Sequence, residues 1–189
     1  MPSRPLIFRT IRWSAWEGCQ VGMEHADIRP ADGGLTLSGV VIGRDEGVKF
    51  GLHYRLKVDS AWRTRAVHLQ TTSGHVLDLE SNGQGGWIEN GAPRPDLQGC
   101  LDVDIQATPL TNTLPIRRLE WLPGQDVEIR LCYIALPDLK VSPQDQRYTA
   151  LTPGSLYRFE SLESGFSADL PVDEDGFVRD YPGLFRRLN

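Results

Sequence analysis

The chain has 189 residues, 40% of them hydrophobic and 24% charged, which is the balance of a soluble globular protein with one domain over residues 1–189. The formal net charge is −5, so the chain has no excess of basic residues of the kind that a general nucleic-acid binder carries. We therefore expect no nucleic-acid partner. The N-terminal residues include Arg4 and Arg9, and no run of about 18 apolar residues occurs, so neither a secretory leader nor a transmembrane segment is expected.

The N-terminal region combines two tryptophans with an acidic and a basic residue. Trp13 and Trp16 are followed by Glu24 and His25, which are adjacent in an expected strand. Neighbouring strand residues point to opposite faces, so Glu24 and His25 cannot form an acid–base pair with each other. Core packing of the tryptophans, with His25 bound to a buried carbonyl, is one interpretation. An aromatic and acidic surface that grips a sugar ring is the other.

Alternation of apolar and polar residues along most of the chain predicts an all-β protein. The longest alternating run, 48–58, predicts a half-buried strand whose polar residues face solvent or, alternatively, line a cavity: Lys49, His53, Arg55 and Lys57. Further strands are predicted at 101–107 and 127–135, and the second is apolar on both faces, which indicates cover on both. Shorter runs predict strands at 35–42, 62–70, 75–80, 155–162, 166–172 and 176–181.

These strands favour a single, mainly antiparallel β domain that is curved and barrel-like and encloses an interior cavity. Residues 74–81 and 154–161 are similar to each other. An internal duplication with halves at about 35–90 and 126–181 explains this similarity, and so does a chance likeness between short strands.

Residues 99–118 contain the densest group of specific polar side chains. Asp102 and Asp104 share one strand face, and a Thr-Asn-Thr turn separates them from Arg117 and Arg118. Because a buried arginine needs a partner, we expect one arginine to bind a carboxylate, and we prefer the pair Asp104–Arg117. A structural clamp and a ligand site are equal alternatives for this cluster.

The cysteines and the absent motifs restrict the chemistry further. Cys19, Cys100 and Cys132 are odd in number and widely separated, which predicts free thiols and a cytoplasmic location. No nucleophile elbow, triad motif or phosphate loop occurs, and the histidines lack zinc-site spacing, so we expect no metal and no cofactor. The sequence at 173–176 resembles the start of a calcium loop, but Leu184 stands where a calcium-binding glutamate is required, so a hairpin turn is expected.

The C-terminal segment is too aromatic for a disordered tail. Tyr181, Leu184 and Phe185 surround Pro182-Gly183, a pair that favours a tight turn. We therefore expect this segment to fold back onto the sheet and close one end of the cavity.

Several of these segments resemble the motifs of one bacterial family. The region 13–25, the segment 99–118, Ser142–Tyr148 and Asp180–Phe185 are similar, in order, to the "putative glycolipid-binding" family. The resemblance implies a non-catalytic protein that binds an amphiphilic small molecule, a glycolipid or another lipid, with the acyl chains on apolar strand faces. The ligand-binding residues that we assign on this basis are Trp16, Glu24, His25, Asp102, Asp104, Asn112, Thr113, Arg117, Arg118 and Tyr148.

Two other functions remain alternatives at this stage. One is an enzyme of unrecognised class that uses Asp102, Asp104 and Arg117 together with Tyr148 and His25. The other is a structural or partner-binding protein whose polar cluster only stabilises the fold. A cavity smaller than about 300 Å³ would count against the lipid-binding interpretation.

Overall fold

The computed structural model describes residues 8–16 and 22–188. Its larger sheet comprises β1 (Arg9–Ala15), β2 (Met23–Ala31), β3 (Gly34–Asp45), β4 (Val48–Asp59), β5 (Thr64–Thr71), β6 (Val76–Ser81), β7 (Trp87–Glu89), β8 (Ala92–Pro93), β14 (Asp180–Tyr181) and β15 (Phe185–Leu188). Its smaller sheet comprises β9 (Asp102–Ile105), β10 (Asp126–Ala135), β11 (Lys140–Thr152), β12 (Leu156–Ser161) and β13 (Ser167–Pro171). The helical turns are η1 (Pro95–Leu97), η2 (Pro109–Asn112) and α1 (Thr113–Arg118).

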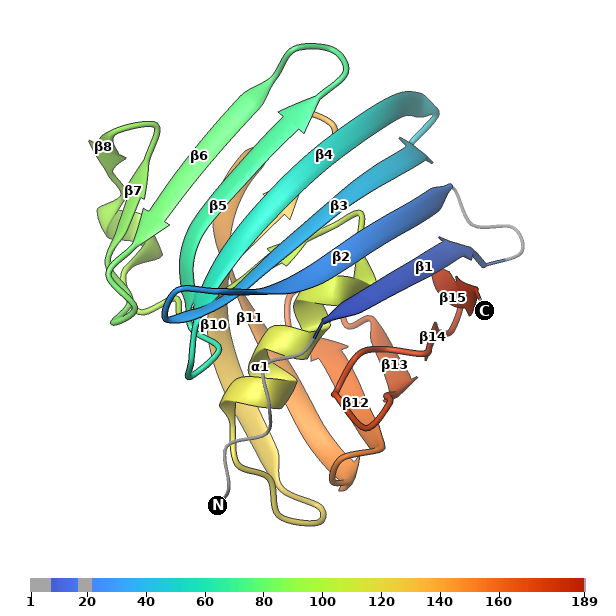
Figure 1. The fold of residues 1–189 in the computed structure, drawn as a ribbon. Coiled ribbons are helices and arrows are strands. Elements are labelled where there is room, and N and C mark those ends of the chain that lie inside the picture. The colour runs from blue at the N-terminus through green and yellow to red at the C-terminus, as the bar shows by residue number, and fades with distance from the viewer. Residues whose placement is uncertain (1–7, 17–21, 189) are drawn as a thin grey trace.

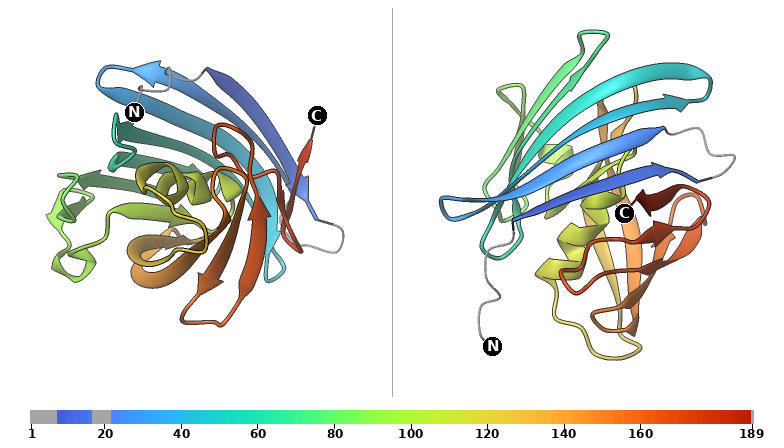
Figure 2. Two further views of the ribbon diagram at one scale, coloured as in Figure 1. Left: turned by 90° about the horizontal axis from the view of Figure 1, so that it is seen from below. Right: turned by 45° about the vertical axis from the view of Figure 1, so that its right-hand side comes forward.

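The strand order confirms a mainly antiparallel β fold. Within the described ranges the larger sheet runs β14-β15-β1-β2-β3-β4-β5-β6-β7-β8 and the smaller sheet runs β13-β12-β11-β10-β9. All neighbouring strands are antiparallel except the parallel pair β9 and β10. The larger sheet curves around α1 and the smaller sheet (Figures 1 and 2). The described strands stay in two separate sheets, so the predicted curvature is present without closure into a barrel.

Two glycines on β3 allow aromatic rings to lie against the backbone of the curved sheet. Gly39 lies opposite Tyr54 and Gly43 lies opposite Phe50. A Cβ atom added to Gly39 would lie 2.4 Å from the Tyr54 ring, and one added to Gly43 would lie 2.8 Å from Phe50. Only glycine fits beneath rings this close, and glycine at such positions permits a strand to bend. Two aromatic rings of β4 therefore pack directly against the backbone of β3.

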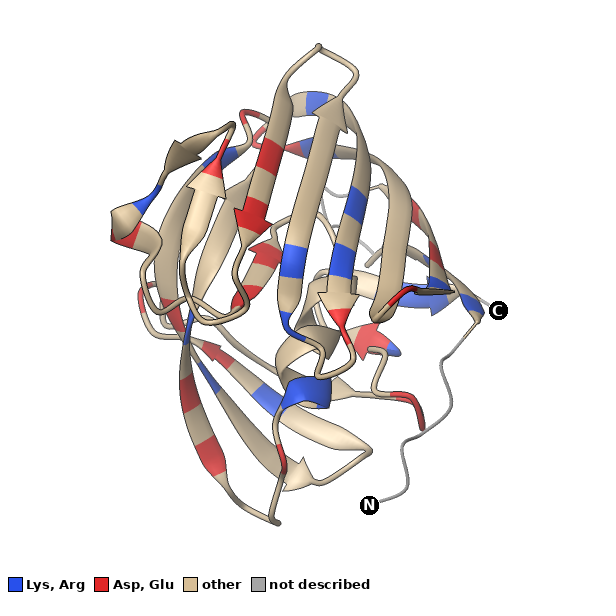
Figure 3. Ribbon diagram, turned by 60° about the vertical axis from the view of Figure 1, so that its left-hand side comes forward, with Lys and Arg blue, Asp and Glu red and all other residues tan. Residues whose placement is uncertain are grey.

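The polar residues of the longest predicted strand face solvent, which confirms the first of the two interpretations, and do not line a cavity. In β4 the even-numbered residues from Phe50 to Val58 are buried. The polar residues between them are exposed on the convex face, where charged residues form stripes along the strands (Figure 3). The inward-facing residues pack into one hydrophobic core with residues from the smaller sheet, which include Ile129, Leu131 and Phe159.

Strand β10 is covered on both faces along part of its length, as its sequence predicts. Leu131, Cys132 and Ile134 are all buried, whereas Glu128 and Arg130 at the other end remain exposed. Cys132 and Cys100 are buried free thiols, while Cys19 lies outside the described residues. The proposed repeat halves contribute mainly to different sheets, and the duplication itself stays a prediction. No helix in the described part of the chain is long and apolar enough to cross a membrane.

Strands β1, β7, β8 and β15 have no counterpart among the predicted strands, and three further segments also differ from the predictions. Strand β11 was missed because its first half is polar and contains Pro143, yet it pairs with β10 over ten register positions. Residues 109–118 form a 3₁₀ turn followed by a short helix, where we expected only a turn. The strand expected at 176–181 is reduced to Asp180–Tyr181. Before it, Asp173 Oδ1 accepts bonds from the amides of Asp175 and Phe177, which confirms the expected hairpin turn.

The C-terminal segment folds back onto the sheet as predicted. The Leu184 amide donates to the Tyr181 carbonyl across the turn (2.9 Å), and Gly183 has a φ of 79°, which favours glycine. Strand β15 then pairs with β1, and Tyr181 and Phe185 are buried. The two aromatic side chains thereby join the Phe159 ring, whose centroid lies 6.0 Å from that of Tyr181.

Deleting the chain from Tyr181 onward should lower the melting temperature, because β1 loses its pairing with β15 and each buried aromatic side chain contributes about 1.5–3 kcal/mol. Binding of an apolar fluorescent dye should rise, because Phe159 loses its cover. Thermal melts and dye titrations measure both effects. Tyr181→Phe, which keeps the ring, should melt close to the full chain. A truncated protein that melts like the full chain would contradict this role.

Candidate functional site

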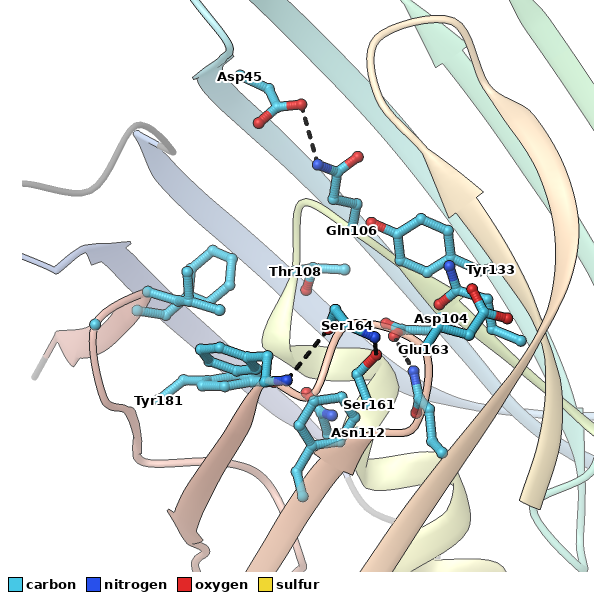
Figure 4. Close-up of a pocket in the computed structure, with 17 residues that line it drawn as sticks. Asp45, Asp104, Gln106, Thr108, Asn112, Tyr133, Ser161, Glu163, Ser164 and Tyr181 are labelled. Atoms are coloured by element: carbon cyan, nitrogen blue, oxygen red, sulfur yellow. Dashed lines mark hydrogen bonds between the residues drawn. The ribbon is translucent and has the colours of Figure 1, made fainter. Parts of the chain in front are cut away.

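A cavity of about 660 Å³ lies between the smaller sheet, β14–β15 and the end of β3 (Figure 4). This volume is within the range of about 300–1,000 Å³ that is usual for small-molecule sites. The structure thus has an open cleft between its two sheets, whereas the sequence analysis expected a cavity enclosed by one barrel-like sheet. Its lining residues are Asp45, Asp104, Gln106, Thr108, Asn112, Tyr133, Gln144, Gln146, Phe159, Ser161, Glu163, Ser164, Phe166, Tyr181, Gly183, Leu184 and Phe185.

The lining divides into two chemically different parts. An aromatic wall, defined as Phe159, Phe166, Tyr181, Leu184 and Phe185, comes from β12, the β12–β13 turn and the C-terminal segment. The ring centroid of Tyr181 lies 6.2 Å from that of Phe166 and 6.1 Å from that of Phe185. These three rings therefore form a continuous surface. The remaining side chains, mostly carboxyls, amides and hydroxyls, form a polar wall.

Asp104 lies at the base of the polar wall. Thr111 Oγ1 donates to its Oδ1 (3.0 Å), and Gln146 Nε2 donates to its Oδ2 (2.7 Å). Burial between the sheets raises the pKa of Asp104, and the bonds from Gln146 and Thr111 oppose this rise. Because both donors are neutral, the protein supplies no counter-charge through them to this carboxyl group.

Asn112 and Tyr148 form a second element of the polar wall. Asn112 lines the cavity and donates through Nδ2 to the Tyr148 hydroxyl (2.8 Å). Tyr148 is buried beneath it, with its ring 5.5 Å from that of Phe159. Burial raises the pKa of Tyr148 well above its ordinary value, and the charge of Asp104 adds to this rise. Tyr148 therefore remains a neutral hydroxyl that positions Asn112.

Glu24 lies directly behind the wall rather than in it. Its Oε1 accepts a bond from Thr108 Oγ1 (2.7 Å) and another from the Tyr54 hydroxyl, whereas Oε2 has no hydrogen-bond partner. Burial raises the pKa of Glu24 to about 7, although both hydrogen bonds favour the charged form. Since Thr108 lines the cavity, Glu24 connects β2 to the cavity wall through one side chain.

The buried ion pair of this region is Asp102–Arg118, so the preferred pairing of Asp104 with Arg117 is wrong. Arg118 Nε lies 3.0 Å from Asp102 Oδ1 and its Nη2 lies 2.5 Å from Oδ2. Successive residues of a helical turn point about 100° apart. The unexpected helix α1 therefore directs Arg118 toward Asp102 and places the Arg117 guanidinium 5.0 Å from the centre of the Trp62 ring.

The other sequence-predicted residues lie outside the cavity lining. His25 is exposed on the outer face, 3.7 Å from Asp27, and within the described ranges it has no bond to a buried carbonyl. Its opposite orientation to the buried Glu24 confirms that the two cannot pair. Trp16 is half-buried beneath the Arg186 guanidinium, and the hydroxyl of Thr113 is buried. Of the ten residues assigned from the sequence, the structure thus brings Asp104 and Asn112 to the cavity.

The sequence analysis missed the polar residues that β10 and β11 contribute. Tyr133, Gln144 and Gln146 reach the cavity because these strands pair side by side, and isolated amides and hydroxyls carry no motif. The only available signal was the alternation of β10, which includes Tyr133. No cluster that could hold a metal ion occurs among the residues that the structure describes.

The described residues form a β protein with a cleft between two curved sheets. A family model described as "Putative glycolipid-binding" matches residues 10–187, so the chain belongs to this family. A crystal structure of a DUF1089 family protein from Pseudomonas aeruginosa is 40% identical, covering 93% of this chain and 92% of that chain with a TM-score of 0.76. A search of curated proteins found no match.

Replacing Arg118 by Met should cost about 3–5 kcal/mol, because it leaves the fully buried Asp102 carboxylate without its counter-charge. Adding Asp102→Leu should recover much of this loss, since it removes the stranded charge. Arg158→Met breaks an exposed pair with Asp169 and should cost at most about 1 kcal/mol. Urea denaturation measures all three variants, and equal losses at Arg118 and Arg158 would contradict the buried-pair assignment.

The Glu24 carboxyl group should make stability depend on pH. Between pH 4.5 and about 7 the native protein holds a proton that the unfolded chain releases, so stability should fall by ~3 kcal/mol as the pH rises. Glu24→Gln, which stays neutral, should flatten this part of the pH profile in urea denaturation at pH 5 to 8. Glu80→Gln on the exposed outer face is the control and should leave the profile unchanged. Identical profiles for Glu24→Gln and the native chain would disprove the assignment.

Proposed function

We propose that this protein binds one amphiphilic small molecule, a glycolipid or related lipid, in the cavity between its sheets, without catalysing a reaction. The observation that carries this proposal is the division of one 660 Å³ cavity into an aromatic wall and a polar wall. An amphiphile has the same division, so its apolar part would contact the rings and its head would contact the amides and carboxyls. Membership of a family described as putative glycolipid-binding supports this choice of ligand.

The aromatic wall supplies the apolar half of the proposed site. Phe166 is 40% exposed although it lines the cavity, so its ring offers surface that a ligand can cover. Removing apolar area from water is worth roughly 25 cal/mol per Å², and this term would provide much of the affinity. Tyr181 and Phe185 are themselves held by the pairing of the C-terminal strands, so the wall is preformed.

The polar wall would orient the head of the ligand. Asn112 is positioned by Tyr148, and Asp104 is positioned by Thr111 and Gln146. Preformed polar groups of this kind determine ligand orientation more than affinity. The buried free thiols of Cys100 and Cys132 support a cytoplasmic site of action, because thiols persist in reducing compartments.

A second candidate, an enzyme that uses Asp104 as a proton donor or acceptor, is favoured by one observation. Burial raises the pKa of Asp104 in an open cleft, which is a common property of catalytic carboxyls. Recovery of a chemically altered ligand after incubation would support this candidate over simple binding.

Two measurements test the binding proposal. Native mass spectrometry of the protein purified from its own host should reveal a bound amphiphile. Calorimetry with monomeric octyl glucoside should show binding that Gln144→Trp abolishes, because the indole fills the cavity from β11. Thr149→Trp places the same side chain on the other face of β11 and should retain binding. Absence of any bound amphiphile and of octyl glucoside binding would refute the proposal.

A further inference from the structure

We propose that the cavity selects its ligand by the charge of the head: it accepts heads rich in hydrogen-bond donors, neutral or cationic, and rejects phosphate and sulfate heads. This inference rests on the proposed binding function and adds a specificity to it. The residues that we assign as specificity determinants are the three carboxyl groups of the lining, Asp45, Asp104 and Glu163.

The first argument is the charge of the lining. The carboxyls come from the end of β3, from β9 and from the turn after β12, so acidic groups enter the cavity from three separate elements (Figure 4). The lining residues of the described chain include no lysine, arginine or histidine. A cleft lined by one sign of charge repels ligands of the same sign and attracts the opposite sign.

The second argument is that the neighbouring arginines are directed elsewhere. Arg118, on the helix beside the cavity, forms its ion pair with the buried Asp102. Arg117 lies over the Trp62 ring, 5.0 Å from its centre. Recognition of phosphate generally uses arginine, lysine or clustered backbone amides. The cavity lining has none of these cationic side chains, so a phosphate head would enter without a counter-charge.

The third argument is the direction of the hydrogen bonds in the polar wall. Gln146 uses Nε2 to donate to Asp104, and its Oε1 has no partner. Gln106 uses Nε2 to donate to Asp45 Oδ2 (3.0 Å), while its Oε1 accepts from the Leu136 amide (2.8 Å). Each of these two amide groups therefore directs one of its N–H donors at a carboxyl group rather than at a ligand.

The consequence is a wall whose charged groups all accept hydrogen bonds. Carboxylates are acceptors only, so a favourable ligand must supply donors to them. Sugar hydroxyls and ammonium groups are such donors, whereas a fully ionised phosphate or sulfate is not. An acceptor-only anion placed against Asp104 or Glu163 forms no hydrogen bond with the carboxylate and brings like charges together.

A matched set of ligands tests this inference on the full chain. Octyl glucoside, octylammonium and octyl phosphate share one alkyl chain and are compared by calorimetry below their micelle-forming concentrations. We expect octyl glucoside and octylammonium to bind, and octyl phosphate to bind at least tenfold more weakly. Asp45→Asn combined with Glu163→Gln should raise the affinity for octyl phosphate and lower the affinity for octylammonium, so the difference between these two charged ligands should narrow.

The control pair is Asp32→Asn with Glu120→Gln, which changes net charge equally at exposed positions outside the lining. This pair should leave the preference intact. Octyl phosphate binding as tightly as octyl glucoside would overturn the charge selection while leaving the proposed function standing. An equal response of the two variant pairs would also overturn it, because net charge alone would then explain the effect. If none of the three ligands binds, the proposed function fails and the inference fails with it.

Discussion

The structure depends on how three carboxyl groups between its sheets, two of them buried and one half-buried in the cavity wall, obtain hydrogen-bond donors. Glu24 belongs to the larger sheet, whereas Asp102 and Asp104 belong to the smaller one. A single segment, residues 108–118, donates to all three: Thr108 to Glu24, Thr111 to Asp104 and Arg118 to Asp102. A buried carboxyl without such a donor costs several kcal/mol, so the position of this segment is closely determined by the two sheets.

This arrangement explains why the segment is helical and why the cavity lies beside it. Three donors spaced over eleven residues must reach carboxyls on two sheets, and an extended strand would direct neighbouring donors to opposite faces. The turn η2 and the helix α1 instead direct Thr108, Thr111 and Arg118 to their separate partners. Thr108 and Asn112 then face the cavity from the same segment, so the polar wall is built on the element that joins the sheets.

The same segment provides a physical link between the fold and the proposed specificity. The carboxyl group of Asp104 is held by neutral donors, while Arg118, on the same segment as Thr111, pairs with Asp102 outside the cavity lining. Had the arginine paired with Asp104 instead, the cavity would contain a cation and would suit an anionic ligand. Because Arg118 pairs with Asp102, the cavity keeps its acidic lining, which is the basis of the proposed charge selection.

Local alternation was sufficient to predict the parts of the fold in which one face is buried and the other is not. Strand β4, the covered half of β10 and the hairpin turn at Asp173 follow from the order of neighbouring residues, as does the fold-back at Gly183. The sequence by itself also identified 99–118 as the region of specific polar contacts. The sequence determined the features that depend on residues close to one another along the chain, namely strands, turns and the polar segment.

Only the tertiary structure decided which distant groups meet. Strand β11 exists because β10 offers it a full set of backbone partners, which its polar sequence does not reveal. Gln144 and Gln146 reach the cavity only through that pairing, and the aromatic wall forms only when β15 lies beside β1. The partner of Arg118 depends on the rotation of a short helix whose six residues carry too little periodicity to predict it. The sequence by itself determined where apolar and polar residues alternate and hence where most strands lie. The packing of two sheets determined the site, because a cavity is defined by residues that are close in space and far apart along the chain.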